Sequence, residues 1–336
     1  MRTVLVPLTL DAARPPGGST LYTASGMAMG SSWSARVMLP PGVDGAVLAQ
    51  ALQAELDEIV AQMSHWDPDS LLSRYNRAPA GSWHALPQQF FAVIDYALQV
   101  YADSGGACDP AAGGLINLWG FGAASRYDQA GFYAPQAEAI EAWLSTRGAR
   151  QPVLSRAGQR LLQPGGAILD LSAVAKGYAV DRMAHCLEER SVRHFVVEAG
   201  GELRGAGVKA NGEPWWVEIE GVPDSDADGA QTIVALHGLA IATSGDYRRY
   251  FQHGSRRAAH TLDPRSGYPA AHGLASVTVL APTCMAADAL STALTVLGPI
   301  DGLAFAQQKD IAARFLVRGA AGLIETTSGA WRSMLQ

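Results

Sequence analysis

The stretch TCMAADALSTALTVL, residues 283–297, decides how the rest of the chain must be arranged. Its composition favours a helix, and its apolar residues are not confined to one stripe. A helix that is hydrophobic on most of its sides is normally buried inside a protein. The stretch therefore predicts a central helix that other elements cover on several sides.

One ionisable residue, Asp288, interrupts this apolar helix, and Ser291 and Thr292 follow it three and four residues later. Residues at these spacings share one helix face. A buried carboxylate is costly without a partner, and a carboxylate with hydroxyls suits Mg²⁺. The alternative is an Asp paired with an arginine, with the hydroxyls bonded back to helix carbonyls. Taken alone, the helix favours this alternative.

The composition describes a globular protein rather than a disordered one. The chain has 336 residues, of which 48% are hydrophobic and 17% charged, enough for one large or two ordinary domains. The net charge of −6, without a Lys/Arg-rich run, argues against nucleic acid or an anionic membrane as the main partner. No apolar run approaches the ~20 residues of a membrane span. The cysteines, Cys108, Cys186 and Cys284, lack CxxC spacing and support neither zinc nor a disulfide framework.

The start of the chain carries at most a weak export signal. MRTVLVPLTLDAARPP has one Arg, a short apolar run broken by Pro7, and no cysteine for lipid attachment. This indicates a cytoplasmic protein, or a periplasmic one if the start codon is misassigned. The following DAARPPGGST, residues 11–20, predicts a flexible lead-in.

Hydrophobic periodicity predicts helices alternating with strands along the chain. Asp44 is placed to cap the first helix. In 107–122 five glycines and a proline indicate irregular backbone, but the apolar residues among them indicate burial, which suggests a bound ligand. The predicted helices cover 44–63, a short segment within 66–77, 87–103, 135–146 and a segment that begins at about 172. The predicted strands cover 29–39, 167–171, 194–198, 215–222, 232–242 and 275–281. A closing hairpin is predicted over 311–332.

The junction after the strand over 167–171 has Ser172 near a helix start, with Lys176 and Asp181 in the first turns. Exposed N–H groups at a helix start favour an anion such as phosphate. The alternative is a capped helix with a Lys–Asp surface pair, which this segment alone favours.

Three patterns mimic binding motifs without meeting their requirements. The loops starting at Asp67 and Asp224 resemble calcium loops but lack the Glu at position 12, so they predict a turn and a solvated acidic loop. The glycines of 205–210 fit a dinucleotide fingerprint, but no helix can follow them. Among the histidines only His260 has suggestive neighbours, and a structural role remains the alternative.

Eight segments, in order, resemble the ApbE family of FAD:protein FMN transferases. They extend from about residue 27 to the C-terminus. The segments are MGSSWS (29–34), SHWDPDSLLSRYNR (64–77), GACDPAAGGLINLWGFG (106–122), LDLSAVAKGYAVD (169–181), VVEAGGELRGAG (196–207), ATSGDYRRYF (242–251), HTLDPRSGYP (260–269) and ADALSTALTVLG (287–298).

The resemblance implies an α+β fold of mixed, largely antiparallel sheets with packed helices. It implies one catalytic domain over 21–336, preceded by the lead-in of 1–20. It also implies a Mg²⁺-dependent enzyme that transfers the FMN moiety of FAD onto a Ser or Thr hydroxyl of an acceptor protein and releases AMP.

The resemblance further assigns roles to individual residues. The metal would be held by Asp288, Thr292 and Ser291, with a main-chain carbonyl near Ala173. His260 would activate the acceptor hydroxyl. The FAD site would be lined by Met29, Tyr75, Ala107, Cys108, Asp109, Asp170, Lys176 and the strand end near Ile241.

Two other functions remain open from the sequence. An FAD diphosphatase would use the same metal site with water in place of the acceptor hydroxyl. A non-catalytic FAD-binding protein would tolerate the loss of Asp288 and His260, yet both are present. The chain does not resemble its own acceptor, because its nearest match to a flavin-acceptor motif, Ser328-Gly329-Ala330, is followed by Trp331.

Overall fold

The core of the computed structural model is one eight-stranded sheet in which every neighbouring pair is antiparallel. The structure describes residues 3–10, 13–223, 231–254, 256–320 and 322–336. In spatial order the strands are β18 (Gly322–Thr327), β17 (Ala312–Gly319), β16 (Leu274–Ala281), β11 (Leu239–Gly245), β8 (Glu202–Ala206), β7 (Phe195–Ala199), β3 (Ser31–Leu39) and β2 (Thr20–Ala28).

Four smaller strand groups surround this sheet. In one, β10 pairs in parallel with β1 and antiparallel with β9, and the other groups are antiparallel. The sheets are therefore mixed and largely antiparallel, as predicted. The groups are β1 (Thr3–Leu5), β10 (Thr232–Leu236) and β9 (Trp215–Glu218); β4 (Trp83–Ala85), β6 (Arg160–Leu162) and β5 (Val153–Ser155); β12 (Tyr250–His253) and β13 (Arg256–Ala259); and β14 (Leu262–Asp263) and β15 (Tyr268–Pro269).

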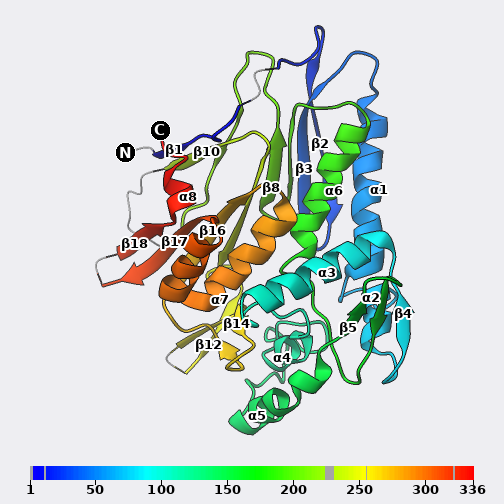
Figure 1. Cartoon of the computed structure of the whole chain (residues 1–336), viewed down its shortest axis with the longest axis vertical. Coiled ribbons are helices and arrows are strands. Elements are labelled where there is room, and N and C mark those ends of the chain that lie inside the picture. Colours follow the sequence, from blue (N-terminus) through cyan, green and yellow to red (C-terminus); the bar gives the residue numbers. More distant parts are fainter. Residues whose placement is uncertain (1–2, 11–12, 224–230, 255, 321) are drawn as a thin grey trace.

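Helices cover one face of the large sheet, while the β1–β10–β9 sheet and α8 pack on the other (Figure 1). α7 and α6 lie side by side across the helical face, and α1 follows α6. The helices are α1 (Gly45–Met63), α2 (Leu71–Asn76), α3 (Gln88–Asp103), α4 (Gly113–Leu118), α5 (Ala137–Thr146), η1 (Gly148–Arg150), α6 (Ala175–Glu189), α7 (Cys284–Gln308) and α8 (Gly329–Arg332).

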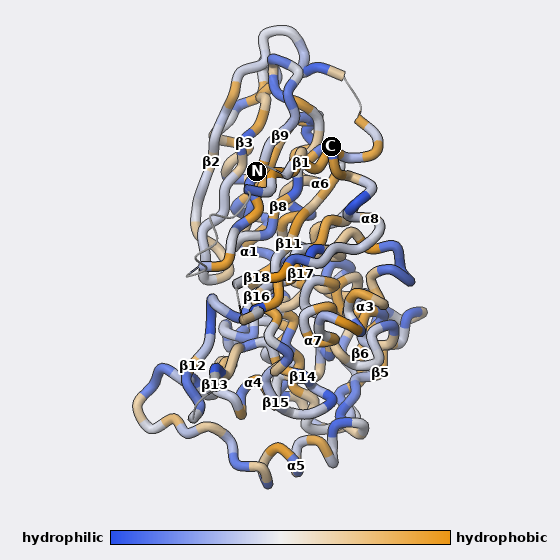
Figure 2. The backbone as a smooth tube through the Cα atoms, turned by 90° about the vertical axis from the view of Figure 1, so that its left-hand side faces the viewer, coloured by the Kyte–Doolittle hydropathy of each residue, from blue (hydrophilic) through white to orange (hydrophobic). Residues whose placement is uncertain are grey.

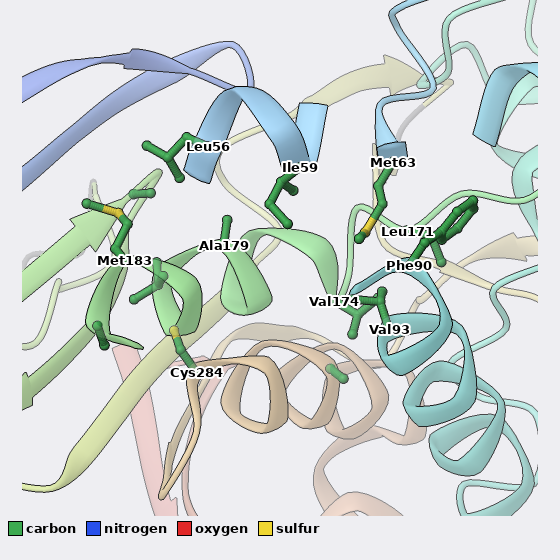
Figure 3. Close-up of a cluster of buried hydrophobic side chains, with 14 of the residues drawn as sticks. Leu56, Ile59, Met63, Phe90, Val93, Leu171, Val174, Ala179, Met183 and Cys284 are labelled. Carbon is green, nitrogen blue, oxygen red and sulfur yellow. The ribbon is translucent and has the colours of Figure 1, made fainter. Parts of the chain in front are cut away.

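The main core lies where α1, α3, α6 and α7 meet. Figure 3 shows Ile59 of α1 pointing toward α6, with Val93 of α3 and Cys284 of α7 reaching the same region. The central strands are coloured mainly as hydrophobic (orange) and the β12–β13 hairpin mainly as hydrophilic (blue) in Figure 2. The hairpin lies outside the main core, but Ala258 and Phe251 pack into a smaller buried cluster with Trp119 and Phe121.

The predicted central helix is confirmed as the first part of α7. Its N-terminus is capped by Thr283, whose hydroxyl accepts from the Ala286 N–H. Gly298, with φ 86°, and Pro299 break the helical geometry, after which a second helical part continues to Gln308. Proline removes a helical hydrogen bond and glycine tolerates the positive φ, so the kink has a local cause.

α7 is the one helix of the described ranges long and apolar enough to cross a membrane, judged by length and composition alone. It carries the buried Asp288 and packs against α6 and the large sheet. Its apolar character is accounted for by this position in the core.

The other predicted helices of the first half are confirmed with small shifts. Asp44 caps α1 by accepting from the Ala46 N–H at 2.8 Å. α2, α3 and α5 also form where predicted. The glycine-rich segment 107–122, predicted to be irregular, contains the short α4, and much of it is buried as expected.

Several predicted strand boundaries were wrong. The strand predicted from 29 begins at Ser31, because Met29 and Gly30 both have positive φ and form the β2–β3 turn, as two-residue hairpins require. The strand predicted over 232–242 is two strands, β10 and β11, separated by a turn at Gly238 (φ 67°). The strand predicted over 215–222 ends at Glu218.

The predicted strand over 167–171 does not form. One isolated bridge joins Ile168 to Ala112, and a turn over 172–174 precedes α6. Ser172 is therefore not the N-cap of α6; Val174 occupies that position without a side-chain cap.

The segment 1–20, expected to be a flexible lead-in, begins with an ordered strand. Residues of β1 pair with β10, and Leu5 is fully buried. β2, which the sequence reading did not identify, begins at Thr20. The predicted acidic loop over 224–229 lies outside the described residues.

Gly177 lets α6 and α7 approach closely. A Cβ at this position would lie 2.3 Å from the Cys284 carbonyl oxygen and 2.7 Å from Asp288 Cβ. Backbone atoms cannot move aside cheaply, so the absence of a side chain here sets the distance between the two helices.

We expect Gly177→Ala to lower the free energy of unfolding, although alanine favours helix over glycine by roughly 1 kcal/mol. Overpacking of this kind costs about 1–3 kcal/mol and occasionally more. Urea unfolding measures the difference. Gly148→Ala is the matched control, because nothing lies within 4 Å of the Cβ it would introduce. A Gly177→Ala variant as stable as the wild type would contradict this account.

Candidate active site

A cavity of about 310 Å³, the first cavity, lies where α6 and α7 meet the end of β11. Its other walls are the 107–112 segment before α4 and the segment around β14. Of the residues to which the resemblance assigned a role, nine line it: Ala107, Cys108, Asp109, Asp170, Ala173, Lys176, His260, Asp288 and Thr292.

Asp288 is nearly fully buried, with 4% of its surface exposed, and it is held from α6. Its Oδ2 accepts from the Gly177 N–H at 2.9 Å. Among the described residues no arginine forms an ion pair with it, so the Asp–Arg pair that the sequence raised as an alternative is not seen. Burial raises the pKa of Asp288, opposed by the charge of Lys176 and the Gly177 N–H. The carboxylate therefore lacks a full counter-charge from the protein.

The two hydroxyls following Asp288 occupy different environments. Thr292 lines the first cavity, and its Oγ1 lies 3.2 Å from Ser244 Oγ of β11. Ser291 is buried behind the cavity wall, donates to the Asp288 carbonyl at 2.9 Å, and meets Ser244 Oγ at 2.8 Å. Ser291 thus supports the site from behind and does not line it.

The turn before α6 supplies the opposite wall. Ala173 lines the cavity there, and Asp170 Oδ1 accepts from the Ser172 N–H at 2.8 Å. The Asp170 N–H in turn donates to Pro110 O, which links this turn to the 107–112 segment. His65 Nε2 lies 3.7 Å from Asp170 Oδ2.

Lys176 is paired with Glu202 of β8 rather than with Asp181. Burial lowers the pKa of Lys176, but Asp288 and Glu202 raise it, and the net shift is upward. Lys176 therefore stays charged. Burial raises the pKa of Glu202 to about 7 despite Lys176, and its Oε2 has no hydrogen-bond partner among the described residues.

Asp181 has a structural role that the sequence reading did not anticipate. Its carboxylate accepts from the N–H groups of Cys284 and Met285, each at 2.8 Å, and pairs with Arg204 at 2.7 Å. A carboxylate at a helix N-terminus satisfies free N–H groups and complements the helix dipole. Asp181 therefore anchors the start of α7 onto α6.

His260 lies across the first cavity, in the segment before β14. Its Nδ1 is 3.1 Å from the Arg249 carbonyl, to which its own N–H also donates at 3.0 Å. Burial lowers the pKa of His260 to about 4, so the ring is neutral near pH 7. Because a carbonyl only accepts, Nδ1 must carry the ring proton, and Nε2 keeps its free lone pair.

The 107–109 segment lines the first cavity through a tightly held turn. Asp109 pairs with Arg147 at 2.9 Å and accepts from the Ala111 N–H at 2.9 Å. Burial raises the pKa of Cys108 to about 12, so this thiol is not a nucleophile at neutral pH. The segment is thus a fixed wall rather than a source of reactive groups.

A second cavity of about 660 Å³ lies on the other side of the α6 start. Met29 lines it, together with residues near the end of α1. Ser172, Lys176 and Arg249 line both cavities, so the two adjoin at these three residues.

Two residues assigned to the FAD site from the resemblance lie away from both cavities. Tyr75 is buried in the main core, and its hydroxyl donates to Leu162 O at 2.9 Å. Ile241 packs against the β1–β10–β9 sheet on the opposite face of β11. The end of the same strand, Thr243 to Gly245, lines the cavity instead.

Sequence reading missed several cavity residues, including Glu202, Ser244, Arg248 and Arg249. Each lies in a segment that resembles the family: Glu202 begins β8, Ser244 is near the end of β11, and the two arginines lie in the loop between β11 and β12. Polar residues at or near the ends of strands were the available signal. No group of three or more His, Cys, Asp or Glu side chains suited to a metal occurs in the described part of the chain.

The comparisons with known proteins agree on one family. The ApbE family model matches residues 29–315, which is more than half of the chain. The FAD:protein FMN transferase of Haemophilus influenzae is 32% identical over 99% of this chain and 97% of its own, and that of Vibrio cholerae is 35% identical over 93% and 92%.

Solved structures give the same answer. The apo crystal structure of the Pseudomonas stutzeri flavinyl transferase ApbE superposes with a TM-score of 0.85, at 37% identity, covering 94% of this chain and 97% of that one. The flavin transferase ApbE from Vibrio cholerae also gives 0.85, at 34% identity, covering 94% and 99%. The α+β fold, the motifs and these likenesses together show that this chain belongs to the ApbE family.

Proposed function

We propose that this protein transfers the FMN moiety of FAD onto a Ser or Thr hydroxyl of an acceptor protein and releases AMP. The relatives described above are named FAD:protein FMN transferases, which gives the donor, the transferred group and a protein as the acceptor. In the reaction the acceptor oxygen bonds to the phosphorus joined to riboflavin. The bond from that phosphorus to the AMP oxygen breaks, and the acceptor proton passes to a base.

The observation that carries the proposal is the meeting of His260 and Asp288 on one cavity. One supplies a neutral imidazole and the other a buried carboxylate whose counter-charge is incomplete. Hydroxyl nucleophiles are weak until a base takes their proton, and cleavage of a diphosphate requires its charge to be neutralised. Both needs are met by groups that line one cavity.

The residues present fit a Mg²⁺ ion. Asp288 and Thr292 offer hard oxygens, and the main chain at Ala173 can add a carbonyl from the facing wall. Burial raises the pKa of Asp288 even though the charge of Lys176 and the Gly177 N–H oppose the shift, and a bound cation would further stabilise the carboxylate. A bound Mg²⁺ would offset charge on the diphosphate and the departing AMP.

His260 is the proposed base. The Arg249 carbonyl holds the proton on Nδ1, leaving Nε2 to accept the hydroxyl proton. Lys176, fixed by Glu202, holds a positive charge on the wall nearest Asp288. The cavity is thus lined by the charged Lys176 and Asp288 on α6 and α7, and by the proton-accepting His260 in the segment before β14.

We expect Asp288→Asn to lower FMN transfer at least ~100-fold. Losing a residue that only supports a metal ligand costs up to about 100-fold, and losing a ligand should cost no less. The fold should persist, because the amide oxygen can still accept from Gly177 and a buried charge is removed. Transfer and Mg²⁺ binding are measured separately. Asp301→Asn, which changes an exposed residue in the second part of α7, is the control. Wild-type turnover in Asp288→Asn would refute the ligand assignment.

For His260→Ala we expect turnover to fall by ~10²–10⁴-fold, the usual contribution of a general base. FAD affinity should change little, because the imidazole acts on the acceptor proton. Steady-state kinetics and FAD titration separate the two effects. His253→Ala on the β12–β13 hairpin removes an exposed histidine that lines neither cavity. Equal losses of affinity and rate would make His260 a binding residue instead.

FAD should act as a donor and FMN should not. Attack on FAD expels AMP, whereas attack on FMN would have to expel an alkoxide or hydroxide, and phosphate-monoester cleavage is among the slowest uncatalysed reactions. In-gel flavin fluorescence of an acceptor protein, with Mg²⁺ or EDTA, measures transfer. Labelling from FMN near the FAD rate, or labelling undiminished by EDTA, would refute the mechanism. AMP release without acceptor would instead favour an FAD diphosphatase.

A further inference from the structure

Arg249 occupies the junction between the two cavities. It is one of only three described residues that line both, with Ser172 and Lys176. Its carbonyl is fixed by two hydrogen bonds from His260, so the side chain leaves the backbone at a defined point beside the proposed base. The junction therefore has a cation on each side, Lys176 from α6 and Arg249 from the loop after β11.

The guanidinium of Arg249 differs from those of Arg248 and Arg126: no carboxylate of the described residues lies within ion-pairing distance of it, and Asp128 acts on it only from further away. Arg248 pairs with Glu220, and Arg126, on the second cavity, is hydrogen-bonded to Asp128 through two nitrogens. Within the described ranges, the Arg249 side chain forms no ion pair within 4 Å. Its guanidinium makes one hydrogen bond there, a 3.5 Å contact with the Phe121 carbonyl. Its exposed donors are thus available to an anion.

The shape of the donor matches this junction. FAD has two ends without net charge, the flavin and the adenosine, which are joined by a negatively charged diphosphate. Each cavity falls within the ~300–1,000 Å³ range of small-molecule sites. If one end of FAD occupies each cavity, the diphosphate must pass the residues that both cavities share.

We propose that the Arg249 side chain binds the diphosphate of FAD at the junction of the two cavities. Arginine presents a planar set of donors that matches phosphate oxygens, and such charge-assisted hydrogen bonds are about twice as strong as neutral ones. This inference rests on the proposed function, because it takes FAD as the ligand. It assigns to Arg249 a binding role distinct from the proton transfer of His260.

The test is calorimetric titration of the full chain with FAD, ADP and riboflavin in Mg²⁺ buffer. ADP carries a diphosphate without the flavin, and riboflavin carries the flavin without phosphate. In Arg249→Ala we expect affinity for FAD and ADP to fall about 10- to 100-fold, the range for hydrogen bonds to charged groups. Riboflavin affinity and the urea unfolding midpoint should not change.

Two further variants sharpen the result. Arg249→Lys should recover part of the FAD and ADP affinity, since it keeps the charge but not the planar fork. Arg257→Ala is the matched control, because Arg257 lies over the Tyr250 ring in the neighbouring hairpin and lines neither cavity. It should bind all three ligands like the wild type.

Three outcomes would overturn the inference. These are unchanged FAD and ADP affinity in Arg249→Ala, an equal loss for riboflavin, or a lowered unfolding midpoint that accounts for the loss. If the wild type itself binds no FAD, the proposed function fails as well. Wild-type FAD binding with an unaffected Arg249→Ala variant would refute only the role of Arg249.

Discussion

The contact between α6 and α7 is the constraint on which the site depends. Gly177 lets the two helices approach until its N–H reaches the Asp288 carboxylate. Asp181, one turn further along α6, accepts from two N–H groups at the start of α7. Each helix thereby satisfies a polar group of the other. A carboxylate is thus held at depth in an otherwise apolar helix.

Burying that carboxylate has a cost that the protein offsets only in part. One backbone N–H and the charge of Lys176 oppose the desolvation, and the pKa of Asp288 is still raised. Lys176 is itself shared with Glu202, whose second oxygen has no partner among the described residues. Such incompletely compensated groups are expected at sites where a ligand completes the electrostatics. The arrangement therefore agrees with a cation and an anionic substrate entering together.

His260 is held in a different way from Asp288. The loop after β11 fixes His260 through the Arg249 carbonyl, which determines the ring tautomer without any second carboxylate. The same residue directs its side chain to the junction of the two cavities. In the proposed mechanism the backbone of Arg249 would position the base and its side chain would bind the diphosphate. Because the hydrogen bonds to His260 use only the backbone, the side chain can vary without moving the proposed base.

Much of the fold could be predicted from local sequence. The α7 stretch, the Asp44 cap and the α3 periodicity each have a cause within a few residues of the chain. Errors arose where the cause was a neighbour distant in sequence. The 167–171 segment has strand-like residues, but among the described residues it forms a β-bridge only with Ala112. Thr3–Leu5 forms a strand because β10 provides an edge far along the chain.

For the site, the chemical types could be read from the residues alone: a lone carboxylate on an apolar helix, a hydroxyl four residues later, and a histidine with polar neighbours. Which of the neighbouring hydroxyls reaches the cavity depends on how the helix packs in the folded chain. Thr292 lines the cavity, whereas Ser291 is turned toward β11 and its own helix backbone. The tertiary structure also decided that Ile241 faces away, since alternate residues of a strand point to opposite faces of the sheet. Spacing along a helix or strand defines a face, but the packing of other elements determines whether that face meets a cavity or a core.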